Sequence, residues 1–112
     1  MEELCRALQE AVLAADREEK SAGSGYGSIF SANKREWLKK LLAQAEGGAS
    51  AGALLQQAEA ALPRLVQLEA EEADHPTFDW YGDHYWETVY MGEAAACREA
   101  IVLLAPFAKA GQ

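Results

Sequence analysis

Apolar residues return every three or four positions along almost the whole chain, and this spacing limits the possible fold more than any other feature. In residues 2–19 the apolar positions share one side of a helix, and the charged positions lie opposite. Similar stripes run through residues 33–46, 50–73 and 77–104, and no segment shows the two-residue alternation of a strand. The pattern predicts an all-α protein, a small up-and-down four-helix bundle.

The boundaries of the first two predicted helices come from residues that stop or cap a helix. Residues 20–32 contain the run SAGSGYGS, whose glycines and serines predict a flexible loop after the first helix. Asn33 followed by Glu36 resembles a capping box and is expected to open the second helix. Gly47 and Gly48 are expected to end it.

The third predicted helix contains a proline. Ser50 is expected to cap this helix, and Pro63 lies inside its apolar pattern. A proline in a helix interior removes one hydrogen bond and clashes with the preceding turn, so we expect the helix to be kinked or split there. Asp74, His75 and Pro76 are expected to stop it.

The fourth predicted helix is the longest. Thr77 or Asp79 is expected to cap it, and it should reach about Leu104, with Pro106 beyond its end. Its predicted core side holds Trp86, Val89, Tyr90, Cys97, Ala100, Ile101 and Leu104. The opposite side holds His84, Glu87, Thr88, Met91, Arg98 and Glu99. Trp80 and Tyr81 fall off the apolar stripe and are therefore expected to face solvent.

The chain has 112 residues and is expected to form a single domain, 1–112, with a net charge of −8. No lysine or arginine occurs between Arg64 and Arg98. That interval holds eight acids, Glu69, Glu71, Glu72, Asp74, Asp79, Asp83, Glu87 and Glu93, while the other ten acids are matched by ten basic residues. The charge excess therefore belongs to one segment, which is also rich in aromatic residues. Such a segment repels nucleic acid and anionic lipid and attracts a basic protein surface.

The N-terminal stretch is charged throughout and therefore does not resemble a signal peptide. No apolar run approaches the roughly 20 residues of a membrane span. We therefore expect a cytoplasmic protein that does not bind membranes. The high alanine content suggests a GC-rich bacterial genome.

The sequence carries no motif of a known catalytic or cofactor site. Dinucleotide, Walker and nucleophile-elbow patterns are absent, and Cys5 and Cys97 both project toward the predicted core. His84 and Glu87 have the spacing of a metal pair, but in the reverse order of a di-iron bundle and on the outer face. We expect no cofactor and no enzymatic activity.

Glu93 is unusual because it falls inside the apolar stripe of the fourth helix. An ionised carboxylate there needs a partner, and Lys34 on the inner side of the second helix is one candidate. The other interpretation is a pocket carboxylate with a raised pKa that anchors a cationic ligand. Gly92 beside it, with Ala96 one turn on, would let another helix backbone approach closely.

A second group of acids is expected at one end of the bundle, where the last two helices meet. Glu69, Glu72, Asp79 and Asp83 would converge there beneath Trp80 and Trp86. Carboxylates suit a hard cation, and carboxylates with aromatic faces suit an organic ammonium or a partner's lysine or arginine. Solvated charges at helix ends would give the same pattern without any ligand. The basic residues Lys34, Arg35, Lys39 and Lys40 are expected to dock against the chain's own acids.

These observations favour a protein-interaction module of the adaptor, chaperone or inhibitor type. Its candidate binding residues are Trp80, Tyr81, Asp83, His84, Glu87 and Glu93. The surface would bind a basic partner or a second copy of the chain, since exposed aromatic residues are favoured as interface anchors. The alternatives are a small-molecule or metal-binding bundle with a carboxylate and aromatic pocket, and a mimic of the charge of DNA.

Overall fold

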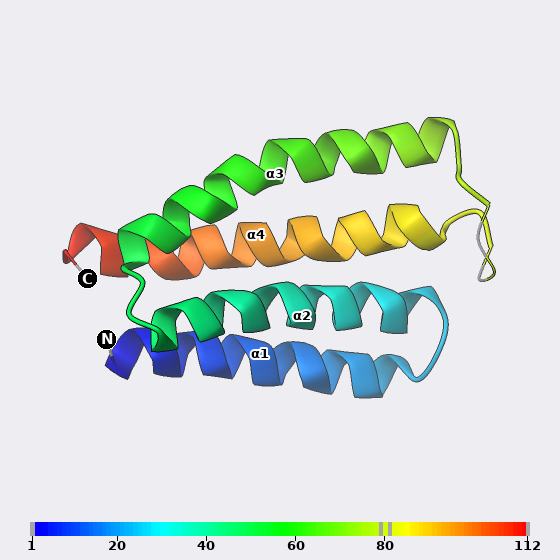
Figure 1. Ribbon diagram of the computed structural model, residues 1–112. Helices are drawn as coiled ribbons and strands as arrows, with labels where there is room; N and C mark the ends of the chain where they lie inside the picture. The colour runs from blue at the N-terminus through cyan, green and yellow to red at the C-terminus, as the bar shows by residue number, and fades with distance from the viewer. Residues whose placement is uncertain (1, 79, 81, 112) are drawn as a thin grey trace.

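The protein is a four-helix bundle. The computed structural model describes residues 2–78, 80 and 82–111, and within this part of the chain it has four α-helices and no strand. The helices are α1 (Glu2–Ala22), α2 (Tyr26–Glu46), α3 (Ala51–Asp74) and α4 (Tyr85–Lys109). Successive helices run in opposite directions (Figure 1). The predicted all-α, up-and-down bundle is therefore confirmed.

The helices lie in the order α1, α2, α4, α3 across the molecule (Figure 1). The extensive contacts join α3 to α4, α1 to α2, and α2 to α4, whereas α1 meets α4 and α2 meets α3 at few points. The core is built from small and medium side chains of all four helices: Leu4, Leu8, Ala15, Leu38, Leu41, Ala45, Ala51, Leu54, Ala58, Ala96, Ala100 and Leu104. None of the described helices combines the length and apolar character needed to cross a membrane.

The contact between α2 and α4 depends on Gly92. A Cβ atom at this position would lie 2.4 Å from the carbonyl oxygen of Phe30 and 3.2 Å from the Cβ of Asn33. Carbon atoms normally pack at roughly 3.5–4.0 Å, so only glycine lets the two backbones approach this closely. The predicted role of Gly92 in close helix packing is confirmed.

Two basic residues of α2 tie it to the neighbouring helices. Lys34 is 7% exposed, and its Nζ lies 2.8 Å from Glu18 of α1 and 2.8 Å from Glu99 of α4. Burial opposes the charge on Lys34, but the two carboxylates outweigh it and raise its pKa. The predicted pair between Lys34 and Glu93 is therefore wrong, because α4 turns Glu99 toward Lys34.

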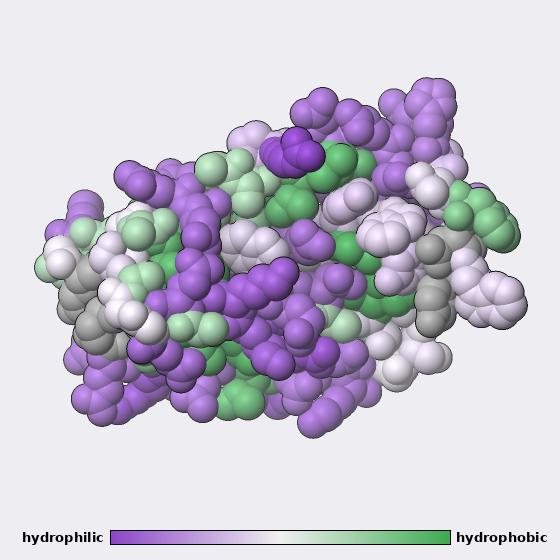
Figure 2. Space-filling model, viewed as in Figure 1, coloured by the Kyte–Doolittle hydropathy of each residue, from purple (hydrophilic) through white to green (hydrophobic). Residues whose placement is uncertain are grey.

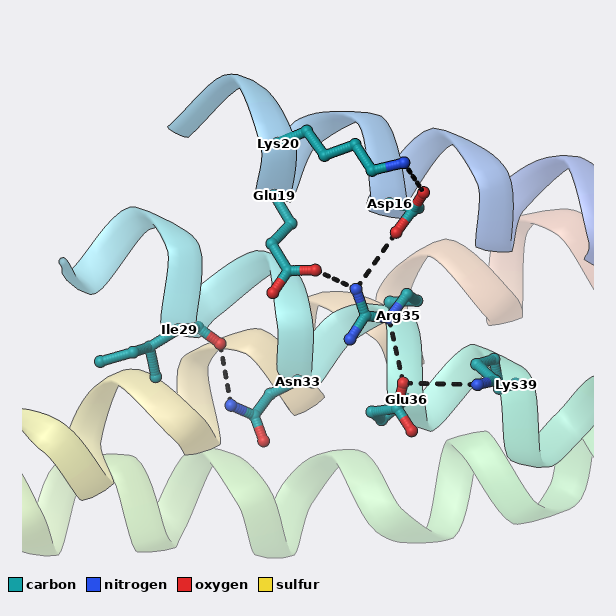
Figure 3. Close-up of polar contacts among 8 residues, drawn as sticks. All are labelled: Asp16, Glu19, Lys20, Ile29, Asn33, Arg35, Glu36 and Lys39. Atoms are coloured by element: carbon teal, nitrogen blue, oxygen red, sulfur yellow. Dashed lines mark hydrogen bonds and ion pairs between the residues drawn. The ribbon is translucent and has the colours of Figure 1, made fainter. Parts of the chain in front are cut away.

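Arg35 of α2 forms ion pairs that join α2 to α1 (Figure 3). Its Nη1 contacts Asp16 at 3.2 Å and also Glu19, and its Nε donates to Glu36 at 3.0 Å. Lys39 lies 3.7 Å from Glu36. The prediction that this basic group docks against the chain's own acids is confirmed for Lys34, Arg35 and Lys39.

The predicted loop at residues 20–32 is wrong over most of its length. α1 continues to Ala22, and α2 begins at Tyr26, with Gly25 as its N-cap. Asn33 does not open the helix, since its Nδ2 donates to the carbonyl oxygen of Ile29 one turn earlier (2.8 Å). Packing of this first part of α2 against α4 stabilises the helix despite its glycine and serine residues.

Both helix-interior prolines are tolerated. α3 runs from Ala51 to Asp74 through Pro63, so the predicted split is wrong, and a kink there is not confirmed. α4 passes through Pro106 and ends at Lys109, although the sequence predicted an end near Leu104. The side chains of Pro63 and Pro106 are exposed, which lets water reach the carbonyl group that each proline leaves without its helical donor.

The predicted start and end of α3 are confirmed. The hydroxyl group of Ser50 accepts a hydrogen bond from the backbone nitrogen of Ala53 (3.1 Å), and the helix stops after Asp74. The predicted start of α4 at Thr77 or Asp79 is wrong, because α4 begins at Tyr85 with His84 as its N-cap. Residues 75–84 therefore form a connection between α3 and α4. Thr88, expected on the outer side of α4, is buried.

Candidate interaction site at the α3–α4 connection

The connection between α3 and α4 is attached to α3 by Glu72. The carboxylate of Glu72 accepts hydrogen bonds from the backbone nitrogen and the hydroxyl group of Thr77, each at 2.8 Å. The backbone nitrogen of His75 donates to the carbonyl oxygen of Glu71 at 2.8 Å and completes the last turn of α3. These hydrogen bonds fix the start of the connection to the end of α3.

Tyr26, the first residue of α2, holds the other end of the connection. Its ring makes an edge-to-face contact with the ring of His84, at 6.1 Å between centroids and 85° between planes. Gly82 has a φ of +115°, and a Cβ atom on it would lie 2.7 Å from the hydroxyl oxygen of Tyr26. Both the backbone angle and this contact require glycine at position 82.

His84 is bound by acids on both sides. Its Nδ1 lies 3.0 Å from an Oε atom of Glu87, and its Nε2 lies 3.6 Å from Asp83. The hydrogen bond to Glu87, followed by the charge of Asp83, raises the pKa of His84. Thr88 adds a bond from its hydroxyl group to the carbonyl oxygen of His84 (2.7 Å), which fixes the start of α4.

Between these two attachments the connection presents two large aromatic side chains to solvent. Phe78 is 84% exposed and Trp80 is 92% exposed. Figure 2 shows hydrophobic and near-neutral side chains protruding at the end of the molecule where this connection lies. Glu71, Asp74 and Asp83, which flank them in the sequence, are also exposed. We call these five residues the acidic aromatic surface.

The structure brings together some of the predicted binding residues and separates others. Trp80 belongs to the acidic aromatic surface with Asp83, and His84 and Glu87 adjoin it at the start of α4. Glu93 lies farther along α4, within the helix rather than at its end. Tyr81 lies outside the described residues.

Of the four acids predicted to converge as a cation site, the three that the structure describes, Glu69, Glu72 and Asp83, form no cluster. Among the described residues no group of three histidine, cysteine, aspartate or glutamate side chains could hold a metal ion. Glu72 is engaged by Thr77, Glu69 is partly buried on α3, and Asp83 contacts His84. Asp79 lies outside the described part of the chain.

Glu93 is half-buried on α4. No hydrogen bond or ion pair joins it to another described residue, and burial raises its pKa, against a weaker opposing effect of the Lys40 charge. The negative charge of Glu93 also acts on Cys97, one turn away. Together with burial, which is the larger effect, it raises the pKa of the Cys97 thiol to about 11. Cys97 is therefore protonated at neutral pH and unsuited to act as a nucleophile.

Two residues of the site were missed by the sequence analysis. Phe78 was given no role, although it lies between the two expected helix starts at Thr77 and Asp79, and Tyr26 was placed in a flexible loop. The combination of Pro76, Phe78 and Gly82 within seven positions is a signal for a connection that exposes an aromatic ring. No comparable signal exists for Tyr26, because its contact with His84 joins residues far apart in the sequence.

Comparison with known proteins identifies no relative of this chain. No family model matches the chain, and no curated protein or solved structure is significantly similar to it. The fold and site define the class as a small helical bundle with an acidic aromatic surface at one end.

Proposed function

We propose that this chain is a binding module that docks a basic segment of a partner protein on the acidic aromatic surface. The observation that carries the proposal is the exposure of Phe78 and Trp80, 84% and 92%, on a connection held at both ends. Burying an aromatic side chain of this size stabilises a fold or a complex by roughly 1.5–3 kcal/mol, and in the bundle alone both rings remain in water. A partner that covers both rings gains this free energy on binding.

The charge of the surface favours a basic partner. Glu71, Asp74 and Asp83 are exposed and lie within seven positions of Phe78 or Trp80 in the sequence, and the chain has no lysine or arginine from residue 65 to residue 97. Arginine and lysine stack on aromatic faces and pair with carboxylates, so they match both features. A second copy docked by the same surface would bring like charges together, and for this reason we assign the surface to a different, basic protein.

The attachment of the connection is expected to aid binding. Glu72, Tyr26 and Gly82 restrict the loop before any partner arrives, so less conformational entropy is lost on association. Adaptors, chaperones and small inhibitors all act by this kind of binding, and no catalytic step is part of the proposal.

A labelled arginine-rich peptide tests the proposal by fluorescence anisotropy at low and high salt. The double variant Phe78→Ser and Trp80→Ser should lower affinity by roughly tenfold or more, corresponding to the loss of about 1.4 kcal/mol. Reversing the charge of Asp74 and Asp83 to lysine should abolish the salt-dependent part of binding. Leu13→Ser is the matched control, because Leu13 is 48% exposed on α1 and distant in sequence from the connection.

Equal binding by the double variant and the control would exclude the acidic aromatic surface as the docking site. Circular dichroism of each variant should match the unmodified protein, since the substituted side chains are exposed. Isolation of the tagged chain from cells, followed by mass spectrometry, should then identify a partner that the control variant retains and the double variant loses.

A second candidate function is binding of an organic amine near Glu93. The half-buried carboxylate without an ion pair among the described residues favours it. Thermal melting against a panel of amines and divalent metal ions tests it, since a ligand at 100 times its Kd adds about 2.7 kcal/mol of stability. A shift that Glu93→Gln removes would support this candidate over the docking module.

A further inference from the structure

The outer face of α4, opposite the core, is unusually apolar for an exposed helix face. Val102 is 76% exposed at its centre, and Met91, Ala105 and Pro106 are exposed along the same side of the helix. Residues 91, 95, 98, 102, 105 and 109 follow one another at alternating spacings of four and three. This is the spacing of a helix seam that packs against another helix.

Shallow hollows flank Val102 on both sides. One, of about 450 Å³, lies toward α1 and is lined by Ala11, Arg98, Glu99, Val102 and Leu103. The other, of about 730 Å³, is lined by Ile101, Val102, Ala105, Pro106 and Lys109. A surface that carries both a protruding side chain and a hollow can pack against a second copy of itself, because a two-fold interface uses the same surface on both copies.

The charges on this face favour a second copy of the same chain as its occupant. The negative excess of the protein belongs to residues 65–97, whereas the stretch from Arg98 onward carries Arg98, Glu99 and Lys109. Glu99 is already bound to Lys34 at 2.8 Å. Two copies with a charge of −8 each can therefore meet on this face with less repulsion than at the acidic end.

We propose that two copies of the chain associate through α4, with the two helices antiparallel and the two-fold axis between Arg98 and Glu99. In this register Ala95 faces Val102 of the second copy, so that a small side chain lies opposite a large one. Arg98 lies at the height of the opposite Glu99, and Lys109 lies beside the opposite Glu87. A parallel pair would instead place Lys109 against Lys109, which costs free energy.

This dimer is independent of the proposed docking function, since it uses the outer face of α4 and leaves the acidic aromatic surface free. Sedimentation equilibrium of the full chain tests it. The unmodified protein should show a concentration-dependent dimer, and Val102→Glu should raise the dissociation constant by roughly a hundredfold without loss of helicity. Trp80→Ser should leave the dimer unchanged. A protein that is monomeric throughout, or a dimer lost in Trp80→Ser but kept in Val102→Glu, would overturn the proposal.

The register is tested by exchanging charges. Lys109→Glu alone, or Glu87→Lys alone, brings like charges together across the interface and should weaken the dimer by roughly tenfold. The chain carrying both substitutions restores an opposite-charge pair with its second copy and should regain the original dissociation constant. If the double variant is no tighter than the weaker single variant, the antiparallel register centred on Arg98 and Glu99 is wrong.

Discussion

Replacement of Gly92 by alanine examines the contact that sets the distance between α2 and α4. The new Cβ atom would lie 2.4 Å from the carbonyl oxygen of Phe30. An ordinary contact of roughly 3.5 Å requires the helices to separate by about 1 Å. The oxygen belongs to the backbone of α2, so no side-chain rotation relieves the clash.

The net effect on stability is the difference between two terms. Alanine raises intrinsic helix stability by about 1 kcal/mol relative to glycine in a helix interior. Overpacking at a close contact costs up to about 3 kcal/mol. We therefore expect Gly92→Ala to lower the free energy of unfolding by about 2 kcal/mol and the melting temperature by roughly 8 °C.

Gly52→Ala is the matched control, because it makes the same change in α3 where the nearest atom to the new Cβ is the Ser50 Oγ, at 3.9 Å. It should raise stability by about 0.5 kcal/mol, since it restricts the unfolded chain without a clash. Urea unfolding followed by circular dichroism measures both variants. A Gly92→Ala protein as stable as the unmodified chain would refute the close packing of α2 on α4.

Two further predictions concern titratable groups. Burial raises the pKa of Glu93, so its ionised form destabilises the fold. Glu93→Gln should therefore increase the free energy of unfolding at neutral pH, and this gain should shrink as the pH falls through the folded-state pKa of Glu93 and disappear below the ordinary glutamate pKa. Urea unfolding at several pH values should show this convergence, and a pH-independent difference would contradict it. The acids around His84 raise its pKa above the ordinary 6.5, so its charged form stabilises the fold at low pH, and this contribution is lost as the pH rises through the raised pKa. His84→Ala should therefore lose more stability in mildly acidic solution than in base, where the ring contact with Tyr26 is still lost but the charge contribution is absent. An NMR titration midpoint below 6.5 would disprove the assigned contacts of His84.

The fold class could be predicted because helical periodicity is a local property of the sequence. Leu38 and Leu41 belong to the stripe predicted in residues 33–46, Leu54 to the stripe in residues 50–73, and Leu104 to the predicted core side of the fourth helix. All four leucines are buried. The predicted helix cap at Ser50 and the predicted helix end at Gly47 were also correct, since each depends only on neighbouring residues.

The helix starts were predicted less well, because tertiary packing overrode local preference. Residues 26–32 contain glycine and serine, yet they are helical where α2 packs against Gly92 of α4. The fourth helix was predicted to start at Thr77 or Asp79, but it starts at Tyr85, after Gly82, whose backbone has a positive φ and packs against Tyr26. Neither contact joins residues that are close in the sequence.

The sequence by itself determined that four amphipathic helices would share one core and that the negative charge would gather with the aromatic residues after Arg64. The tertiary structure alone decided which charges meet. Lys34 pairs with Glu18 and Glu99 and leaves Glu93 without an ion pair among the described residues, and Trp80 is held on an exposed connection. The physical reason is that periodicity assigns a side chain to a face of its helix, whereas the packing of the helices decides what lies opposite that face.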